Sequence, residues 1–298
     1  MPLHVLSRAS SHSPLPHAEA QWTPLAAAAV ALISSEAREV DAVAFVCGAG
    51  NSRARTPSRT QAEPAPLRYA LLCLCDGFPP LVAVSALRGL PGLGAGCPSV
   101  RCAAAMALAR HLREGHLAGA LDVHSLRRLV TACGDSFPEA SGAAFAALAA
   151  LFDALGLAPS APQAAAAAQA AQEVWTVRKE LLARAHALPP HAQLAALSPL
   201  AFALLGVARG SLAPLRSAGG LAPMPLPPSG DVAGALEGLA ELLSSACEQR
   251  EEHPALALQA AEHLLRVAEV TVRTGHSRIA PSATPRFFYS RPTHPGRA

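Results

Sequence analysis

The segment that decides the fold runs from Pro98 to Gly115 and reads P-S-V-R-C-A-A-A-M-A-L-A-R-H-L-R-E-G. Ser99 suits the cap of a helix, and Gly115 suits its end. Apolar residues recur between them at steps of three and four, which is the spacing of one helical face. We therefore predict a helix with two faces. The apolar face should bury Val100, Ala104, Ala107, Leu108 and Leu112, and the other face should leave Arg101, Arg110 and Arg113 in water.

The order of residues in this segment resembles the second helix of an armadillo or HEAT repeat. Pro, Ser, Val and Arg come first, and paired small residues and a Leu follow. The resemblance implies an all-α, armadillo/HEAT-like α-solenoid, in which stacked helical hairpins bury a shared core. It also implies a non-enzymatic scaffold whose groove binds a peptide or helix of another protein. Such a protein needs no catalytic residues, metal or cofactor.

Composition points to the same fold class. The chain has 298 residues, of which 51% are hydrophobic, 15% are charged and 4% are aromatic. Ala and Leu dominate the apolar residues, and both favour helices, whereas the β-branched and aromatic residues that strands prefer are scarce. We expect a folded, all-α protein rather than a chain that is disordered throughout.

The helical pattern divides the chain into three parts. Residues 1–66 are predicted to form a poorly ordered region with one helix candidate, residues 67–274 a helical domain, and residues 275–298 a basic disordered tail. Within the domain, residues 210–230 form a Pro- and Gly-rich loop. Helices are expected at 67–75, 80–90, 99–114, 121–133, 139–155, 162–187, 190–209, 231–248 and 254–274. The last six pair in sequence order as three irregular antiparallel hairpins.

Charge and cysteine content bear on partners and compartment. A net charge of +3 is too small to predict a nucleic-acid partner. Arginines do cluster at 53–59 and in the tail, but aromatic residues for stacking on bases accompany them only at Phe287, Phe288 and Tyr289. The seven cysteines lie mostly in apolar segments, as free thiols do in a reducing compartment. We expect an intracellular protein, cytoplasmic or nuclear, whose partners are other proteins, with no small-molecule substrate.

One segment keeps a membrane alternative open. Residues 187–208 carry no formal charge, but His191, Gln193, Ser198 and three prolines interrupt the apolar run. A core helix of a solenoid can be apolar on all sides without meeting lipid. We expect a buried helix, and the alternative is a membrane-associated subunit that uses 187–208.

Three local patterns resemble reactive sites, and we expect each to be structural. Cys97, Cys102, His111 and His116 are zinc-ligand types, but Cys102 and His111 are nine positions apart on one helix and point in nearly opposite directions. We expect Cys102 to be a buried thiol and the histidines to lie on the surface. The stretch 134–137 resembles the serine block of GDSL-type hydrolases, and the stretch 43–53 resembles part of a dinucleotide-binding loop. The first follows a helix candidate instead of the strand that would present its serine. The second resembles a strand and a glycine turn, but Arg53 stands where the third glycine should be, and Pro57 argues against the phosphate-binding helix.

Candidate partner-binding residues remain. Trp175 is expected to anchor the core of a long helix, but an exposed Trp with a neighbouring Arg178 would be an interface hot spot. Arg101, Arg110 and Arg113 are the other candidates. The chain is also a candidate fragment of a larger solenoid, because neither end of the predicted array supplies an obvious polar cap.

Overall fold

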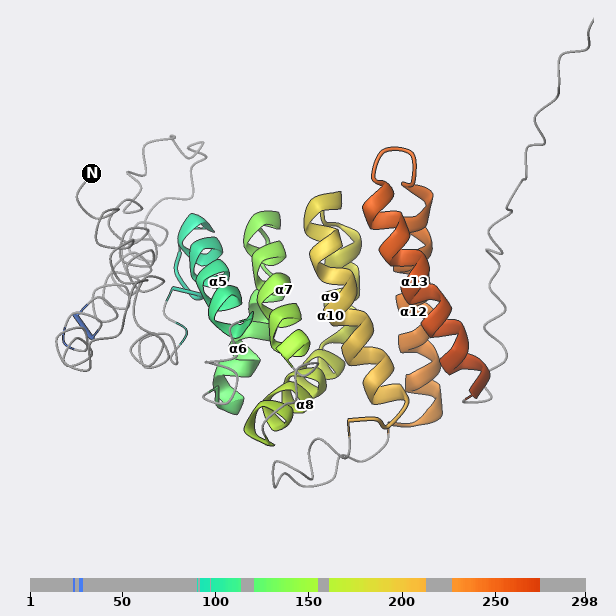
Figure 1. The fold of residues 1–298 in the computed structure, drawn as a ribbon, viewed down its shortest axis with the longest axis horizontal. Coiled ribbons are helices and arrows are strands. Elements are labelled where there is room, and N and C mark those ends of the chain that lie inside the picture. Colours follow the sequence, from blue (N-terminus) through green and yellow to red (C-terminus); the bar gives the residue numbers. More distant parts are fainter. Residues whose placement is uncertain are drawn as a thin grey trace, which may run out of the picture.

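The computed structural model describes residues 90, 92–96, 98–113, 121–154, 161–212 and 227–273, together with positions 24, 27 and 28. Between residues 98 and 273 the described chain forms eight α-helices and no strand (Figure 1). This confirms the all-α class. The helices expected at 67–75 and 80–90 lie outside the described residues, apart from residue 90, as does the tail 275–298. Of the region 1–66, only the three helical positions are described.

The helices begin and end where local sequence favours it. Asp122 caps α6, because its carboxylate accepts a hydrogen bond of 2.7 Å from the Ser125 amide. Pro138 and Pro190 stand in the first turns of α7 and α10, where a missing amide hydrogen costs nothing. The bounds are α5 Pro98–Arg113, α6 Val123–Cys133, α7 Pro138–Asp153, α8 Ala161–Thr176, α9 Arg178–His186, α10 Pro190–Ala208, α12 Ser229–Glu248 and α13 Pro254–Arg273.

The helices form two rows that pack against each other. In one row α5 contacts α7, α7 contacts α10, and α10 contacts α13, as can be followed across Figure 1. In the other row α6 contacts α8, α8 contacts α9, and α9 contacts α12. The predicted hairpins are contacts between the rows: α6 packs on α7, α8 and α9 on α10, and α12 on α13. The core lies between the rows.

The predicted long helix at 162–187 is wrong, because the chain bends at Val177 and forms α8 and α9 instead. Val177 has φ −108° and ψ 23°, outside the helical region. The bend has a local reason, since Val174, Thr176 and Val177 are β-branched and fit a helix poorly. It separates a helix that packs on α6 from one that packs on α12.

Helix α10 is the centre of the fold. It contacts α7, α8, α9, α12 and α13. Among the described helices it is the one long and apolar enough to cross a membrane. However, 67% of its most apolar stretch is buried inside the protein. Burial against five helices explains the apolar sequence of 190–208, as predicted for a core helix.

The burial of residues in α5 can be compared with the buried and exposed faces predicted from its sequence. All five predicted core residues are buried, from Val100 at 0% to Ala107 at 6% exposure. Arg110 and Arg113 are exposed, also as predicted. Two expectations are wrong: Arg101 is bound by the α6–α7 turn and does not reach freely into water, and His111 is buried with 2% exposure instead of lying on the surface. Tertiary partners, which the helical period does not encode, account for both.

Candidate functional site

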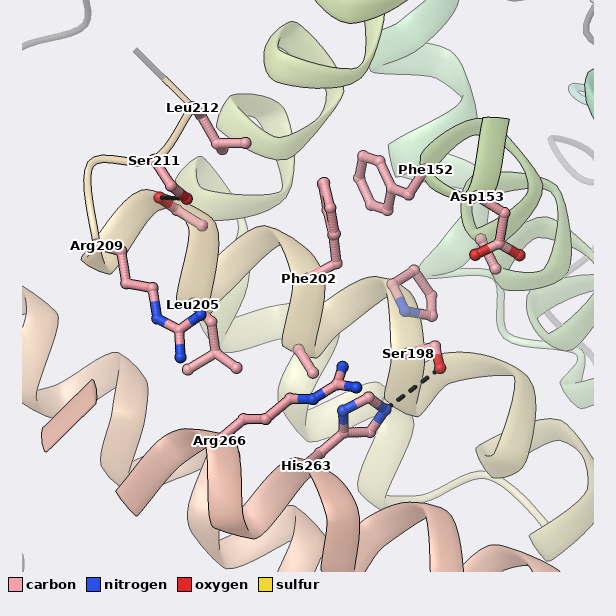
Figure 2. A pocket seen from close by; sticks show the side chains of 14 residues that line it. Phe152, Asp153, Ser198, Phe202, Leu205, Arg209, Ser211, Leu212, His263 and Arg266 are labelled. Carbon is pink, nitrogen blue, oxygen red and sulfur yellow. Dashed lines mark hydrogen bonds between the residues drawn. The ribbon is translucent and has the colours of Figure 1, made fainter. Parts of the chain in front are cut away.

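The groove with the clearest mixed chemistry lies between α7, α10 and α13. Its volume is about 420 Å³, and residues from the three helices and from the turn after α10 line it (Figure 2). The helices are three successive members of one row, so the groove exists only because that row is assembled. The lining includes Phe152, Asp153, Ser198, Phe202, Leu205, Arg209, Leu212, His263 and Arg266.

Aromatic and aliphatic side chains form the apolar part of this groove. The rings of Phe152 and Phe202 are stacked with centroids 4.5 Å apart. Phe152 is buried, whereas Phe202 is half-buried and faces the groove in Figure 2. Leu205 and Leu212 extend the apolar wall. A partly exposed aromatic ring held by a buried one is a preorganised surface for an apolar side chain.

Charged side chains stand at the ends of the groove. Arg209 pairs with Glu269 at 3.2 Å, and Arg266 pairs with Glu262 of the same helix. Both pairs are largely exposed, so each arginine can exchange its carboxylate partner for another at small cost. In Figure 2, Asp153 lies at the opposite side from Arg209, with Phe202 between them. The lining charges are thus two arginines and one aspartate.

Ser198 and His263 form the one hydroxyl–imidazole pair in this lining. Nε2 of His263 lies 3.2 Å from Oγ of Ser198, and Gln259 donates to the same Oγ at 2.5 Å. Burial lowers the pKa of His263, the charge of Arg266 lowers this pKa further, and Glu262 partly opposes the shift. The net result is a neutral imidazole near pH 7, which can accept the hydroxyl hydrogen.

The surroundings of this pair differ from those of an activated serine. Nδ1 of His263 has no hydrogen-bond partner among the described residues, so no carboxylate orients the ring there. Ser198 stands within α10, directly before Pro199, and not at a strand-to-helix turn. The pair instead ties α10 to α13, with Gln259 as the third member. Its geometry is that of a structural bridge.

Trp175 and Arg178 lie together at the bend between α8 and α9. Trp175 is 9% exposed, which confirms a core position. The guanidinium of Arg178 lies 4.7 Å from the ring centroid, donates to the Trp175 carbonyl at 3.0 Å, and reaches Asp231 of α12 at 3.4 Å. The two candidate partner-binding residues are therefore in contact with each other, and the arginine covers the ring.

Arg101 takes part in an enclosed ion pair with Asp135. Its guanidinium donates to both carboxylate oxygens of Asp135 and to the carbonyls of Ala95 and Gly96. The side chains of Arg101 and Asp135 are 15% and 10% exposed. Burial raises the pKa of Asp135, but hydrogen bonds from Arg101 and from the Phe137 amide, with the charges of Arg101 and Arg184, outweigh it and lower this pKa. The pair fastens α5 to the α6–α7 turn.

Two of the sequence patterns that resemble reactive sites, the stretch 134–137 and Cys102, lie close to the Arg101–Asp135 ion pair. Asp135 of the stretch 134–137 is held by Arg101, and its Oδ1 accepts from the Phe137 amide at 2.9 Å, which shapes the start of α7. Cys102 is half-buried rather than fully buried, and its pKa is raised by burial and then by Glu139. Within the described residues no three His, Cys, Asp or Glu side chains gather as metal ligands do. Cys97, His116 and the stretch 43–53 lie outside them.

A second groove, of about 650 Å³, runs along α6, α8 and α9 on the other row. Its lining contains Glu173, to which Arg127 and Gln169 donate at 3.1 Å and 3.0 Å. Arg127 is largely exposed, so this pair contributes little to stability. Among the described residues, the lining of this groove includes no aromatic side chain, unlike the first groove with its stacked Phe152 and Phe202.

The sequence did not predict the first groove. Phe152 and Phe202 are fifty positions apart, and Ser198 and His263 are sixty-five apart, so no local pattern joins them. The comparisons add no family: no protein-family model, curated protein or solved structure matches this chain. The geometry of the described helices is therefore the basis for any functional conclusion.

Proposed function

We propose that this protein is a non-enzymatic scaffold with an armadillo/HEAT-like α-solenoid fold, which binds a segment of another protein in the groove between α7, α10 and α13. Three features support the fold: the hairpin contacts, the two rows, and the helix at 98–113 whose sequence resembles a repeat helix. The irregular helix lengths and the bend at Val177 make it an irregular array. An intracellular location is part of this proposal.

The groove itself carries the functional part of the proposal. A half-buried Phe202, stacked on a buried Phe152, offers an apolar surface at the centre, with Arg209 and Arg266 close by. Exposed aromatic surface with adaptable arginines is the combination found at energetic centres of protein interfaces. We infer a partner segment with one large apolar side chain and a neighbouring carboxylate.

A display experiment tests this function. A random-peptide library is selected against the full-length protein, and the bound peptides are located by hydrogen exchange. The proposal expects enriched peptides with an apolar anchor and an acidic residue, which protect amides of α7, α10 and α13 around the groove. Enriched peptides that protect other helices, or selection without enrichment, would contradict it.

The membrane alternative rests on α10, whose length and hydropathy fit a span. Its contacts with five other helices favour the core role, because insertion into lipid would have to separate them. Extraction of the protein from cells into high-salt buffer without detergent would exclude the membrane-associated subunit. Retention in the pellet until detergent is added would favour it over the scaffold.

A further inference from the structure

The outer face of α13 carries an apolar stripe that the described residues leave uncovered. Leu258, Leu265 and Val272 are 75%, 74% and 78% exposed. They are spaced by seven residues, which places them on one face of the helix. Ala261 and Ala268 are exposed between them. The other large exposed apolar side chains of the described residues are Met106, Val123 and Phe137, which belong to other elements.

This stripe is unusual for the helix that bears it. Its other face packs on α10 and α12 through Leu256, Val267 and Val270, so α13 is apolar on both faces. A continuous exposed stripe on a folded protein marks a surface that something covers. Whatever covers this stripe must present apolar side chains to it and charges that complement those around it.

Charge supplies the first part of the answer. Residues 229–273, which contain α12 and α13, hold eight acidic residues and three arginines, so this hairpin carries a net charge of −5. Glu237, Glu241 and Glu248 of α12 are exposed. Glu262 and Glu269 lie beside the stripe on α13, in exposed ion pairs with arginines that another cation can replace at small cost. An occupant with positive charges on either side of an apolar centre would fit this surface.

The chain contains one such segment directly after α13. Residues 274–298 hold four arginines and no acidic residue, a net charge of +4. Within them, Arg286 and Arg291 enclose Phe287, Phe288 and Tyr289. The apolar centre between two cations is the complement of an apolar stripe flanked by glutamates.

The length of the connection also fits. Phe287 is fourteen residues beyond Arg273, the end of α13. Fourteen residues reach at most about 46 Å when extended. Leu258 lies fifteen residues back along the helix, about 22 Å at the helical rise. A segment joined this closely binds at a high effective concentration, so even weak contacts suffice.

We propose that residues 286–291 bind the outer face of α13, with Phe287, Phe288 and Tyr289 packed around Leu265 at the centre of the stripe. The arginines on either side meet the glutamates of the α12–α13 hairpin. The segment thereby covers the stripe within the same chain. The stripe lies on the face of α13 opposite its packed face, although Glu262 and Glu269 beside it also pair with the groove residues Arg266 and Arg209.

Cross-linking in the full-length protein identifies the occupant. A photoreactive residue is introduced as Leu265→benzoylphenylalanine, and as a control at Met106, which is 62% exposed on α5. A mixture of light and ¹⁵N-labelled protein separates links within a chain from links between chains. We expect the Leu265 probe to link to 286–291 of its own chain and the Met106 probe not to do so. Links from Leu265 to a second copy, to residues 1–89, or to no protein segment would overturn the proposal.

Two further variants keep the result from depending on one probe. Arg286→Glu with Arg291→Glu should lower the yield of that cross-link severalfold, and so should raising the salt concentration, because exposed charges are screened. In a separate full-length variant, Phe287, Phe288 and Tyr289 are each replaced by Ser. Amides of α13 should then exchange severalfold faster, while those of α5 are unchanged. Equal exchange in α13 with and without the aromatic residues would overturn the proposal.

Discussion

Helices α5 and α13 lie at the two ends of the same row of described helices, but they differ in how much of their side-chain surface is buried. Eight of the sixteen residues of α5 are buried, against seven of the twenty residues of α13. Arg101 of α5 is enclosed by a carboxylate and two carbonyls, whereas Arg266 of α13 pairs at the surface with Glu262 of its own helix. Arginine–carboxylate pairs are thus enclosed at one end of the row and exposed at the other. Burial, more than residue type, sets how much each pair contributes to stability.

The largest effect should come from the core face of α5. Leu112→Ala removes a side chain with 0% exposure and should cost about 3 kcal/mol in the free energy of unfolding. Leu258→Ala on α13 removes the same atoms from a side chain that is 75% exposed and should cost less than about 1 kcal/mol. Urea unfolding of both variants measures the difference. Equal losses of unfolding free energy would contradict the difference in burial between Leu112 and Leu258.

Breaking the enclosed Arg101–Asp135 pair should also cost more unfolding free energy than breaking the exposed Arg266–Glu262 pair. Asp135→Ala leaves the enclosed guanidinium of Arg101 without its carboxylate and should cost about 2 kcal/mol. Glu262→Ala leaves the exposed Arg266 in water and should cost less than about 0.5 kcal/mol. Melting temperatures of the two variants, measured at the same salt concentration, provide the check. A larger fall in melting temperature for Glu262→Ala would contradict the prediction that the Arg101–Asp135 pair contributes more to stability.

Gly142 of α7 and Gly234 of α12 differ in the space around them, because the first lies at a close helix contact and the second faces open space. A Cβ at Gly142 of α7 would lie 2.9 Å from the Ala192 Cβ of α10, so Gly142→Ala should destabilise the fold by about 1–2 kcal/mol. At Gly234 of α12 a Cβ would meet nothing within 4 Å, and Gly234→Ala should stabilise the fold by about 0.5–1 kcal/mol. Opposite shifts in the midpoint of unfolding are expected, and shifts of the same sign would contradict the close approach of α7 and α10.

The smallest effect concerns pH. The pKa of His263 is lower in the folded protein than the value of about 6.5 in an unfolded chain. The unfolded state therefore binds a proton first, and the stability that His263 contributes is complete above about pH 6.5 and is lost as the pH falls toward the folded pKa. His263→Gln should flatten the loss of stability between pH 7 and pH 5. An unchanged pH profile would show that this imidazole stays solvated.

Local sequence predicted much of the helix content, because capping residues and apolar periodicity act over a few positions. The helix predicted at 99–114 and its five buried residues followed from that periodicity. The helices predicted to start at 121 and 139 start within two residues of those positions, at Val123 and Pro138. The bend at Val177 was missed, since residues 162–187 have a continuous helical composition and only three β-branched residues mark the break.

The groove could not be predicted in the same way. It depends on which helices become neighbours, and the residues that line it are separated by up to more than one hundred positions along the chain. Arg101 illustrates the same limit, because its partner Asp135 is thirty-four positions away. A helical pattern says which residues face inward, but not which residue of another helix they meet.

The most direct test of the account measures the affinity of a display-selected peptide for three full-length proteins. The first is the wild type, the second carries Arg209→Glu and Arg266→Glu in the groove, and the third carries Arg110→Glu and Arg113→Glu on α5. We predict that the groove variant raises the dissociation constant at least about tenfold, which is about 1.4 kcal/mol, and that the α5 variant leaves it unchanged. A peptide whose affinity depends on α5 and not on the groove would contradict the proposed binding site.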